Sequence, residues 1–101
     1  DNMAKEILDI YVEKGYEYIF DLNFNSEEGN DLESQYECWF ESSSIGQKQY
    51  TVSDNMFKLT LSAIDTAKLT TNLEKYKVYV SNISSGVHSK LLTGRIHMEG
   101  L

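Results

Sequence analysis

The chain has 101 residues, and its 16 Asp and Glu against nine Lys and Arg give a formal net charge of −7. This length is typical of one domain, so we expect residues 1–101 to form a single domain. The few scattered cations argue against nucleic acid or an anionic membrane as a partner. No apolar run approaches the ~20 residues of a membrane span, and charges in the first segment predict no signal peptide.

The first segment, "MAKEILDIYVEKG", fits two kinds of element. An amphipathic helix would use Ala4, Ile7, Leu8 and Tyr11 as its apolar face, whereas a strand would use Leu8, Ile10 and Val12. We favour a strand from about Ile7 to Val12. The following "VEKGY" then forms a turn with Gly15 at its corner.

Alternating apolar and polar residues predict six more strands, at 16–24, 36–41, 49–52, 56–61, 74–83 and 90–98. The stretch "SSSIGQK" breaks the alternation after the second of these, "SDN" reads as a tight hairpin turn, and "SSG" turns the chain between the last two strands, which should pair. About seven short strands without helical alternation predict an all-β, immunoglobulin-like antiparallel β-sandwich. The predicted core-facing residues are Tyr16, Tyr18, Phe20, Leu22, Phe24, Tyr36, Cys38, Phe40, Tyr76, Val78, Val80, Leu92, Ile96 and Met98.

One stretch changes from strand to helical spacing. In "FKLTLSAIDTAKL" the alternation ends at Leu61, and a short helical turn is predicted near residues 63–69. Ser62 can act as N-cap, with Asp65 completing a short capping box. We expect Ile64, Ala67 and Leu69 to plug one open end of the sandwich, so that Ile64→Asp should destabilise the domain.

Three patterns are weaker indications of chemistry. Asp21, Asn23 and Asn25 with the acids that follow resemble a calcium loop, but the sixth position lacks Gly and the twelfth lacks Glu. His88 and His97 are expected on the two partners of the last hairpin, too few for a structural zinc site. The single Cys38 is expected to be a buried apolar residue. The sequence therefore predicts no catalytic residue, no cofactor and no metal site.

Trp39 and Tyr79 lie opposite to the core-facing residues of their strands, as do Tyr11 and Ile19. A Trp and a Tyr on the wet faces of neighbouring strands would form an amphipathic patch suited to binding. Burial of that face under the N-terminal segment is the alternative. We take Trp39 and Tyr79 as the candidate partner-binding residues.

The order of these segments resembles a small β-sandwich module of tailed-bacteriophage virion proteins. Such modules occur as stand-alone structural proteins and as N-terminal domains of baseplate and receptor-binding-protein components. The resemblance rests on "EKGYEYIFDLNF", "GNDLESQYECWF", "FKLTLSAIDTAKL" and "YKVYVSNISSGVHSKLLTGRIHM". Its most specific parts are "LSAIDTAKL" and the Gly within "LLTGRI".

The resemblance implies a structural protein located in the virion. It would be a non-catalytic docking module in the tail, baseplate or fibre attachment region, bound to other virion proteins in a symmetric, multi-copy assembly. Two alternatives are a carbohydrate-binding module for host-surface glycans, in which Trp39 and Tyr79 stack on sugar rings, and a capsid or head-decoration protein. A small hydrolase would need a nucleophile–base pair, which the sequence does not offer.

Overall fold

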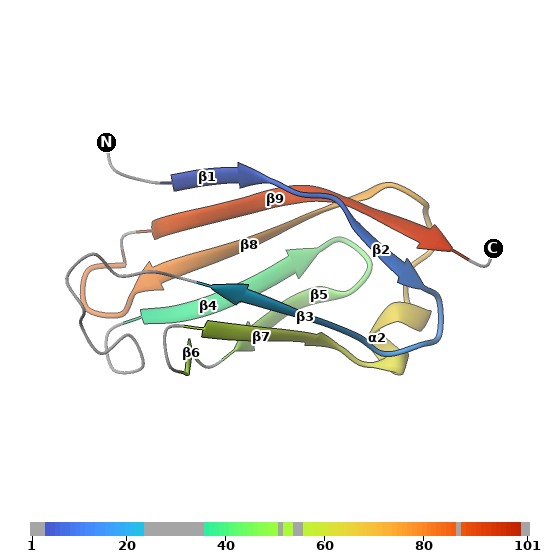
Figure 1. Ribbon diagram of the computed structural model, residues 1–101, viewed down its shortest axis with the longest axis horizontal. Helices are drawn as coiled ribbons and strands as arrows, with labels where there is room; N and C mark the ends of the chain where they lie inside the picture. Colours follow the sequence, from blue (N-terminus) through green and yellow to red (C-terminus); the bar gives the residue numbers. More distant parts are fainter. Residues whose placement is uncertain (1–3, 24–35, 51, 54–55, 87, 100–101) are drawn as a thin grey trace.

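The computed structural model describes residues 4–23, 36–50, 52–53, 56–86 and 88–99. Over these residues the chain forms two packed β-sheets with a short helix at one end (Figure 1). The larger sheet has the order β1-β9-β8-β4-β5, with β2 also paired to β9, and the smaller has the order β3-β7-β6. The strands are β1 Ala4–Ile7, β2 Ile10–Glu13, β3 Tyr18–Asn23, β4 Tyr36–Ser42, β5 Gly46–Tyr50, β6 Val52–Ser53, β7 Met56–Leu61, β8 Glu74–Asn82 and β9 His88–Glu99, and helix α2 is Ala63–Ala67.

This arrangement confirms the all-β, immunoglobulin-like sandwich. Strands β5, β4, β8 and β9 take the places of the C′, C, F and G strands of a variable-type domain, and β3, β7 and β6 take those of B, E and D. Because β1 and β2 follow one path along β9, the described strands occupy about eight positions, one more than expected. The sheet is also not wholly antiparallel, since β1 and β2 run parallel to β9.

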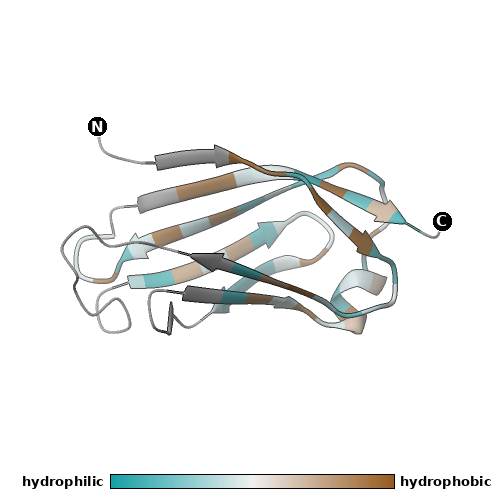
Figure 2. Ribbon diagram, viewed as in Figure 1, coloured by the Kyte–Doolittle hydropathy of each residue, from teal (hydrophilic) through white to brown (hydrophobic). Residues whose placement is uncertain are grey.

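The predicted alternation places most of the core correctly. Strand β8 alternates between buried and exposed residues, and Figure 2 shows the matching change in hydropathy along it. Burying these apolar side chains between the sheets is the main stabilising term of the fold. The buried apolar residues are Ile10, Val12, Cys38, Phe40, Ile45, Leu59, Leu61, Leu69, Tyr76, Val78, Val80, Leu92, Ile96 and Met98.

Several expected boundaries differ in the structure. Tyr16 was expected in the core but lies in the turn before β3 and is 63% exposed. The expected break of the alternation after β4 is a turn at 43–45, but the next strand, β5, begins at Gly46 instead of 49 and pairs back on β4. The expected hairpin around 53–55 exists as the short pairing of β6 with β7, with residues 54–55 outside the described part of the chain. Phe24, which was expected in the core, lies outside the described residues.

The turn at 43–45 is tied to the start of β8 by Glu74, whose side chain is buried. Its carboxylate accepts hydrogen bonds from the backbone N–H of Ser44 at 2.8 Å and from the Ser44 hydroxyl. Burial alone would raise the pKa of Glu74, but these hydrogen bonds outweigh it and hold the pKa below its usual value. The carboxylate thus joins the β4–β5 turn to the neighbouring strand.

The N-terminal segment forms strands, as favoured, and not the alternative helix. Its path is broken once, because Leu8 and Asp9 leave the strand geometry between β1 and β2. The Leu8 N–H donates to the Thr93 carbonyl at 2.8 Å, and the Leu8 carbonyl accepts from the Tyr76 hydroxyl at 2.6 Å. Leu8 was expected on the buried face, but this break turns it outward, and it is 42% exposed.

Gly94 is what lets the broken segment lie so close to β9. A Cβ atom placed on Gly94 would lie 1.8 Å from the Leu8 carbonyl oxygen and 3.1 Å from the Tyr76 ring. The obstacle is backbone, which cannot rotate away as a side chain can. The Gly within "LLTGRI" is therefore required by the close approach of two strands.

We predict that Gly94→Ala lowers the free energy of unfolding by at least ~2–3 kcal/mol, because the Leu8 carbonyl and its hydrogen bonds must move. Chemical denaturation measures this directly. Gly86→Ala is the control, since its φ is +73° but nothing lies within 4 Å of the added Cβ. The control should cost only ~1–2 kcal/mol. Equal costs for the two variants would contradict the close approach.

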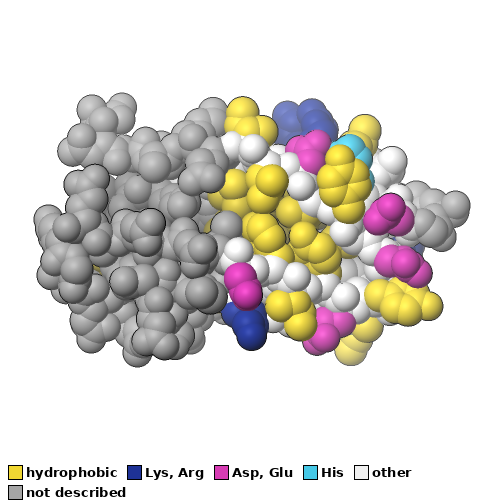
Figure 3. Space-filling model, viewed as in Figure 1, with side chains coloured by type: hydrophobic (Ala, Val, Ile, Leu, Met, Phe, Trp, Pro, Cys, Tyr) yellow, Lys and Arg dark blue, Asp and Glu magenta, His cyan; other side chains and the backbone are white. Residues whose placement is uncertain are grey.

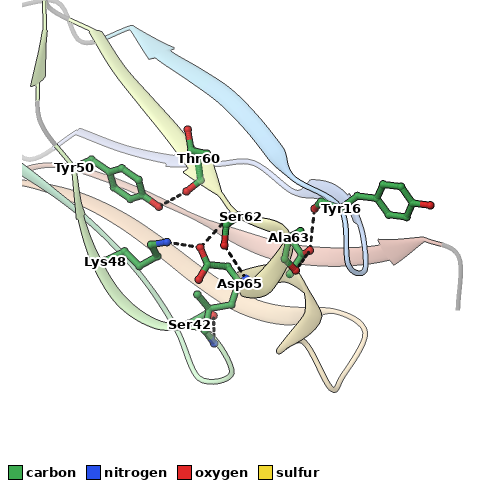
Figure 4. Close-up of polar contacts among 10 residues, drawn as sticks. Tyr16, Ser42, Lys48, Tyr50, Thr60, Ser62, Ala63 and Asp65 are labelled. Atoms are coloured by element: carbon green, nitrogen blue, oxygen red, sulfur yellow. Dashed lines mark hydrogen bonds and ion pairs between the residues drawn. The ribbon is translucent and has the colours of Figure 1, made fainter.

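The predicted helical turn exists and is capped as expected. Ser62 is the N-cap, its hydroxyl accepts from the Asp65 N–H at 3.0 Å, and the Asp65 carboxylate accepts from the Ser62 N–H at 3.0 Å. Lys48 of β5 pairs with the same carboxylate (Figure 4). On the other side, the Thr66 hydroxyl donates to the Tyr16 carbonyl at 2.9 Å and accepts from the Gly15 N–H at 3.0 Å. The helix thus joins the β2–β3 turn to the larger sheet.

The helix covers one end of the sandwich, as expected, but two of the three residues expected to face the core do not. Ile64 is 73% exposed and Ala67 is also exposed, whereas Leu69 and Thr66 are fully buried. Because the helix has only five residues, its capping contacts decide which side faces inward, and these turn Asp65 and Thr66 toward the sandwich. The expectation that Ile64→Asp is destabilising is therefore overturned.

We now predict that Leu69→Ala lowers the free energy of unfolding by ~2–5 kcal/mol, through the loss of a fully buried side chain. Ile64→Asp should change it by less than ~0.5 kcal/mol, since the residue is exposed and a carboxylate suits the first turn of a helix. Thermal melts of the two variants provide the comparison. A larger loss from Ile64→Asp would restore the original expectation.

Candidate binding face

The outer face of the larger sheet gathers side chains from its strands in rows. The strand register puts Leu91, Tyr79, Trp39 and Gln49 in one row, from β9 across β8 and β4 to β5. The next row holds Ile7, Thr93, Lys77, Glu41 and Gln47. Arg95 and Lys75 form part of a third row. On β4, β8 and β9 these side chains point away from the core because their neighbours along each strand are buried, and Ile7 shares the face of Thr93, with which it pairs.

The structure brings the two predicted binding residues together. Trp39 and Tyr79 are directly opposed on neighbouring strands, and both side chains are half-buried. The Tyr79 hydroxyl accepts a hydrogen bond from Gln47 Nε2 at 2.9 Å, and Lys77 Nζ lies 5.4 Å from the centre of the Tyr79 ring. The N-terminal strands extend the sheet beside β9 instead of folding over this pair. They are therefore not the cover that the alternative interpretation required.

The two other residues predicted to point outward, Tyr11 and Ile19, lie on different sheets. Tyr11 is 57% exposed on the same sheet, at its β2 edge, where its ring stacks on His97 with 4.3 Å between centroids. Ile19 is 53% exposed on β3, in the other sheet. Tyr11 can therefore belong to a surface with Trp39 and Tyr79, whereas Ile19 cannot.

A second apolar surface lies at the side of the sandwich. Figure 3 shows hydrophobic side chains gathered in the middle of the view, over the gap between β2 and β3. Tyr18 and Phe20 of β3 are only partly buried although they pack on the core. This side is open because β1 and β2 join β9 instead of β3.

A groove of about 670 Å³ lies on the outer face next to the Trp39 row. Ile7 forms an apolar wall and is 77% exposed. Three cations and two carboxylates surround the rest, in a chain whose net charge is −7. The lining residues are Ile7, Asp9, Glu41, Ser42, Ser43, Lys75, Tyr76, Lys77, Thr93, Gly94 and Arg95.

The sequence interpretation missed this gathering of cations. It treated the nine Lys and Arg as scattered, yet Lys75, Lys77 and Arg95 line one groove. The signal was present in two places. Lys75 and Lys77 alternate along one face of β8, and Arg95 follows the Gly of the strand that was predicted to pair with it.

Asp9 holds the edge of this groove. Its Oδ1 accepts from the Arg95 N–H at 3.0 Å, and its Oδ2 accepts from His97 Nε2 at 2.8 Å. The hydrogen bond from His97, followed by that from Arg95, keeps the pKa of Asp9 below its ordinary value. Both carboxylate oxygens are therefore engaged in fixing the segment between β1 and β2 on β9.

The predicted placement of His88 and His97 on the two partners of the last hairpin is wrong. Both residues lie on β9, nine positions apart, which separates them by about 30 Å along an extended strand. Strand β9 begins earlier than the sequence suggested and includes His88. His97 is instead engaged with Asp9 and Tyr11.

The other chemical groups support no reactive centre among the described residues. Cys38 is fully buried, as predicted, and burial raises the pKa of its thiol to about 12. No three His, Cys, Asp or Glu side chains in the described part of the chain are placed to hold a metal ion. Of the calcium-loop residues, Asp21 and Asn23 lie on β3, and the others are outside the described residues.

Known proteins resemble this chain in fold only. No protein-family model matches the sequence, and no curated protein matches it either. The natural killer cell receptor NKp44, described as a triggering partner in natural cytotoxicity, has a similar structure with a TM-score of 0.55 and 10% identity. The match covers 93% of this chain and 97% of the receptor, and it supports the immunoglobulin-like sandwich.

A putative glycoside hydrolase from Bacteroides vulgatus matches at a TM-score of 0.44 and 8% identity. This match covers 90% of the chain but only 17% of the hydrolase. At 10% identity, the likeness to NKp44 shows a shared fold and nothing further. Within the described residues, no helix has both the length and the apolar character to cross a membrane.

We predict that the amide of Arg95 reports a titration whose midpoint lies below pH 3.8, the ordinary pKa of an Asp. A lowered pKa in the folded state means that the Asp9 contacts stabilise the fold above this pH and are lost as the pH falls through the lowered value. An NMR pH titration of the ¹⁵N-labelled chain measures it. The step should vanish in Asp9→Asn, and a midpoint at or above 3.8 would contradict the proposed contacts.

Proposed function

We propose that the chain is a non-catalytic docking module of a tailed-bacteriophage virion, which binds other structural proteins in the tail, baseplate or fibre attachment region. The observation that carries the docking role is the outer face of the larger sheet, where Trp39 and Tyr79 lie side by side next to a groove. The virion setting is supported by the sequence resemblance alone.

The physical features of this face suit protein binding. Half-buried aromatic side chains offer a large apolar area with little rotamer entropy to lose, and such residues often carry most of the energy of an interface. They stand on paired strands rather than on loops, so their positions are held by backbone hydrogen bonds. In a symmetric virion the same face would meet a partner in each repeated copy.

Particle composition tests the proposal. In purified virions of a phage that encodes this chain, quantitative mass spectrometry should find the protein in several copies per particle. Particles assembled with the double variant Trp39→Ala and Tyr79→Ala should contain at least ~10-fold fewer copies, because the loss of two interface aromatics weakens docking. Absence of the wild-type chain from virions would overturn the virion role.

The adjacent aromatic pair also supports a second candidate, a carbohydrate-binding module. Sugar rings stack on flat aromatic side chains, and Gln47 and Gln49 beside the pair can supply hydrogen bonds. Since Trp39 is the only Trp in the chain, its fluorescence reports on this face alone. A saturable change in that fluorescence with host-surface glycans would favour this candidate, and silence in the same titration would remove it.

A further inference from the structure

The cations of the groove are placed against each other. Lys75 of β8 is directly opposite Arg95 of β9, and Lys77 is the next residue along the same face. Like charges directly opposite on neighbouring strands are destabilising. In a chain with 16 acidic residues, an opposite charge was readily available for either position. Because this unfavourable pair of cations lies inside a groove, it points to a binding role.

The neighbouring groups leave these cations only partly compensated. Among the described residues, Lys77 forms an ion pair with Glu41, and it is a loose one of 3.8 Å. Arg95 donates from one terminal nitrogen to the Leu73 carbonyl at 2.9 Å, which leaves other guanidinium donors available. Lys75 is exposed and forms no ion pair with the residues that the structure describes. Asp9 accepts hydrogen bonds from the Arg95 N–H and from His97, and its charge also interacts with that of Arg95, so it compensates this cation in part.

We propose that this groove binds an acidic peptide segment of a partner protein, with one carboxylate seated between Lys75 and Arg95. A carboxylate there would bridge the two opposed cations and accept charge-assisted hydrogen bonds from both. An apolar side chain next to that carboxylate would pack on the exposed Ile7 at the groove wall. The proposal deepens the docking function above, on which it rests for the protein nature of the partner.

The lining selects against a more highly charged ligand. Three cations against two carboxylates leave a net charge of +1 around the groove. A single carboxylate complements that charge, whereas a phosphate or a chain of phosphates would bring additional negative charge against Glu41. The volume of about 670 Å³ exceeds what one small anion fills and falls within the range of sites for small ligands or a few side chains.

An NMR titration tests the proposal. The probe is the peptide acetyl-Leu-Glu-Leu-amide, added to the ¹⁵N-labelled chain, with acetyl-Leu-Gln-Leu-amide as the uncharged match. The Glu peptide should produce saturable shifts at the amides of Lys75, Lys77 and Arg95. The Gln peptide should bind at least ~10-fold more weakly. Equal binding of the two peptides, or shifts that do not gather at the groove, would overturn the proposal.

Two variants sharpen the test. Lys75→Gln should weaken binding of the Glu peptide at least ~10-fold. In the absence of peptide it should raise the melting temperature by about 1–3 °C, because it removes a like-charge contact. Lys14→Gln is the matched control, since it changes the net charge equally but lies in the exposed turn after β2. It should leave binding unchanged, and a fall in melting temperature specific to Lys75→Gln would contradict the repulsion.

A titration with inorganic phosphate tests whether the groove is a phosphate site instead. If phosphate saturates the same amides at lower concentration than the Glu peptide, the groove is a phosphate site and the carboxylate assignment is overturned. The NMR titrations measure binding at the groove, whereas particle mass spectrometry measures whether the protein is present in virions. Failure of one is therefore distinguishable from failure of the other.

Discussion

The close approach of the Leu8 carbonyl to Gly94 is the constraint on which the outer face depends. At this point the N-terminal chain breaks its strand geometry, so that β1 and β2 can both pair with β9 in parallel. The break places Ile7 on one side and Asp9 on the other, both at the groove. The Tyr76 hydroxyl and the Thr93 carbonyl hold it from the neighbouring strands. Without a residue lacking Cβ at position 94, this edge of the sheet could not form as it does.

Electrostatics and packing divide the molecule into two kinds of region. Inside, charged groups are compensated, since Asp65 pairs with Lys48 at the helix cap and Glu74 accepts hydrogen bonds from Ser44. On the outer face, Lys75 and Arg95 oppose each other and are only partly compensated by the groups around them. Buried charges must be paired for the fold to be stable, whereas an exposed like-charge pair costs little because water screens it. The outer face therefore has freedom to serve binding that the core does not have.

The fold itself carries no information on the partner. A sandwich of this kind occurs in the receptor NKp44, and identities near 10% allow no transfer of function. The docking proposal therefore rests on the side chains of one face, and the virion setting on the order of sequence segments. These supports are independent, so the proposed binding of an acidic segment does not depend on whether the protein belongs to a virion or to another assembly.

The sequence by itself determined the strands, the sandwich and most of the core, because a half-buried strand has a period of two that local reading detects. It also determined the helix cap, since Ser62 and Asp65 interact over three residues. Tertiary structure alone decided that Ile64 faces water and Thr66 the core, because a helix of one turn is oriented by contacts with Lys48, Gly15 and Tyr16 from elsewhere in the chain. The same holds for the groove. Strand register brings Arg95 opposite Lys75, and the pairing of the distant β1 with β9 aligns Ile7 with Thr93. Register is set between two strands and is not a property of either strand alone.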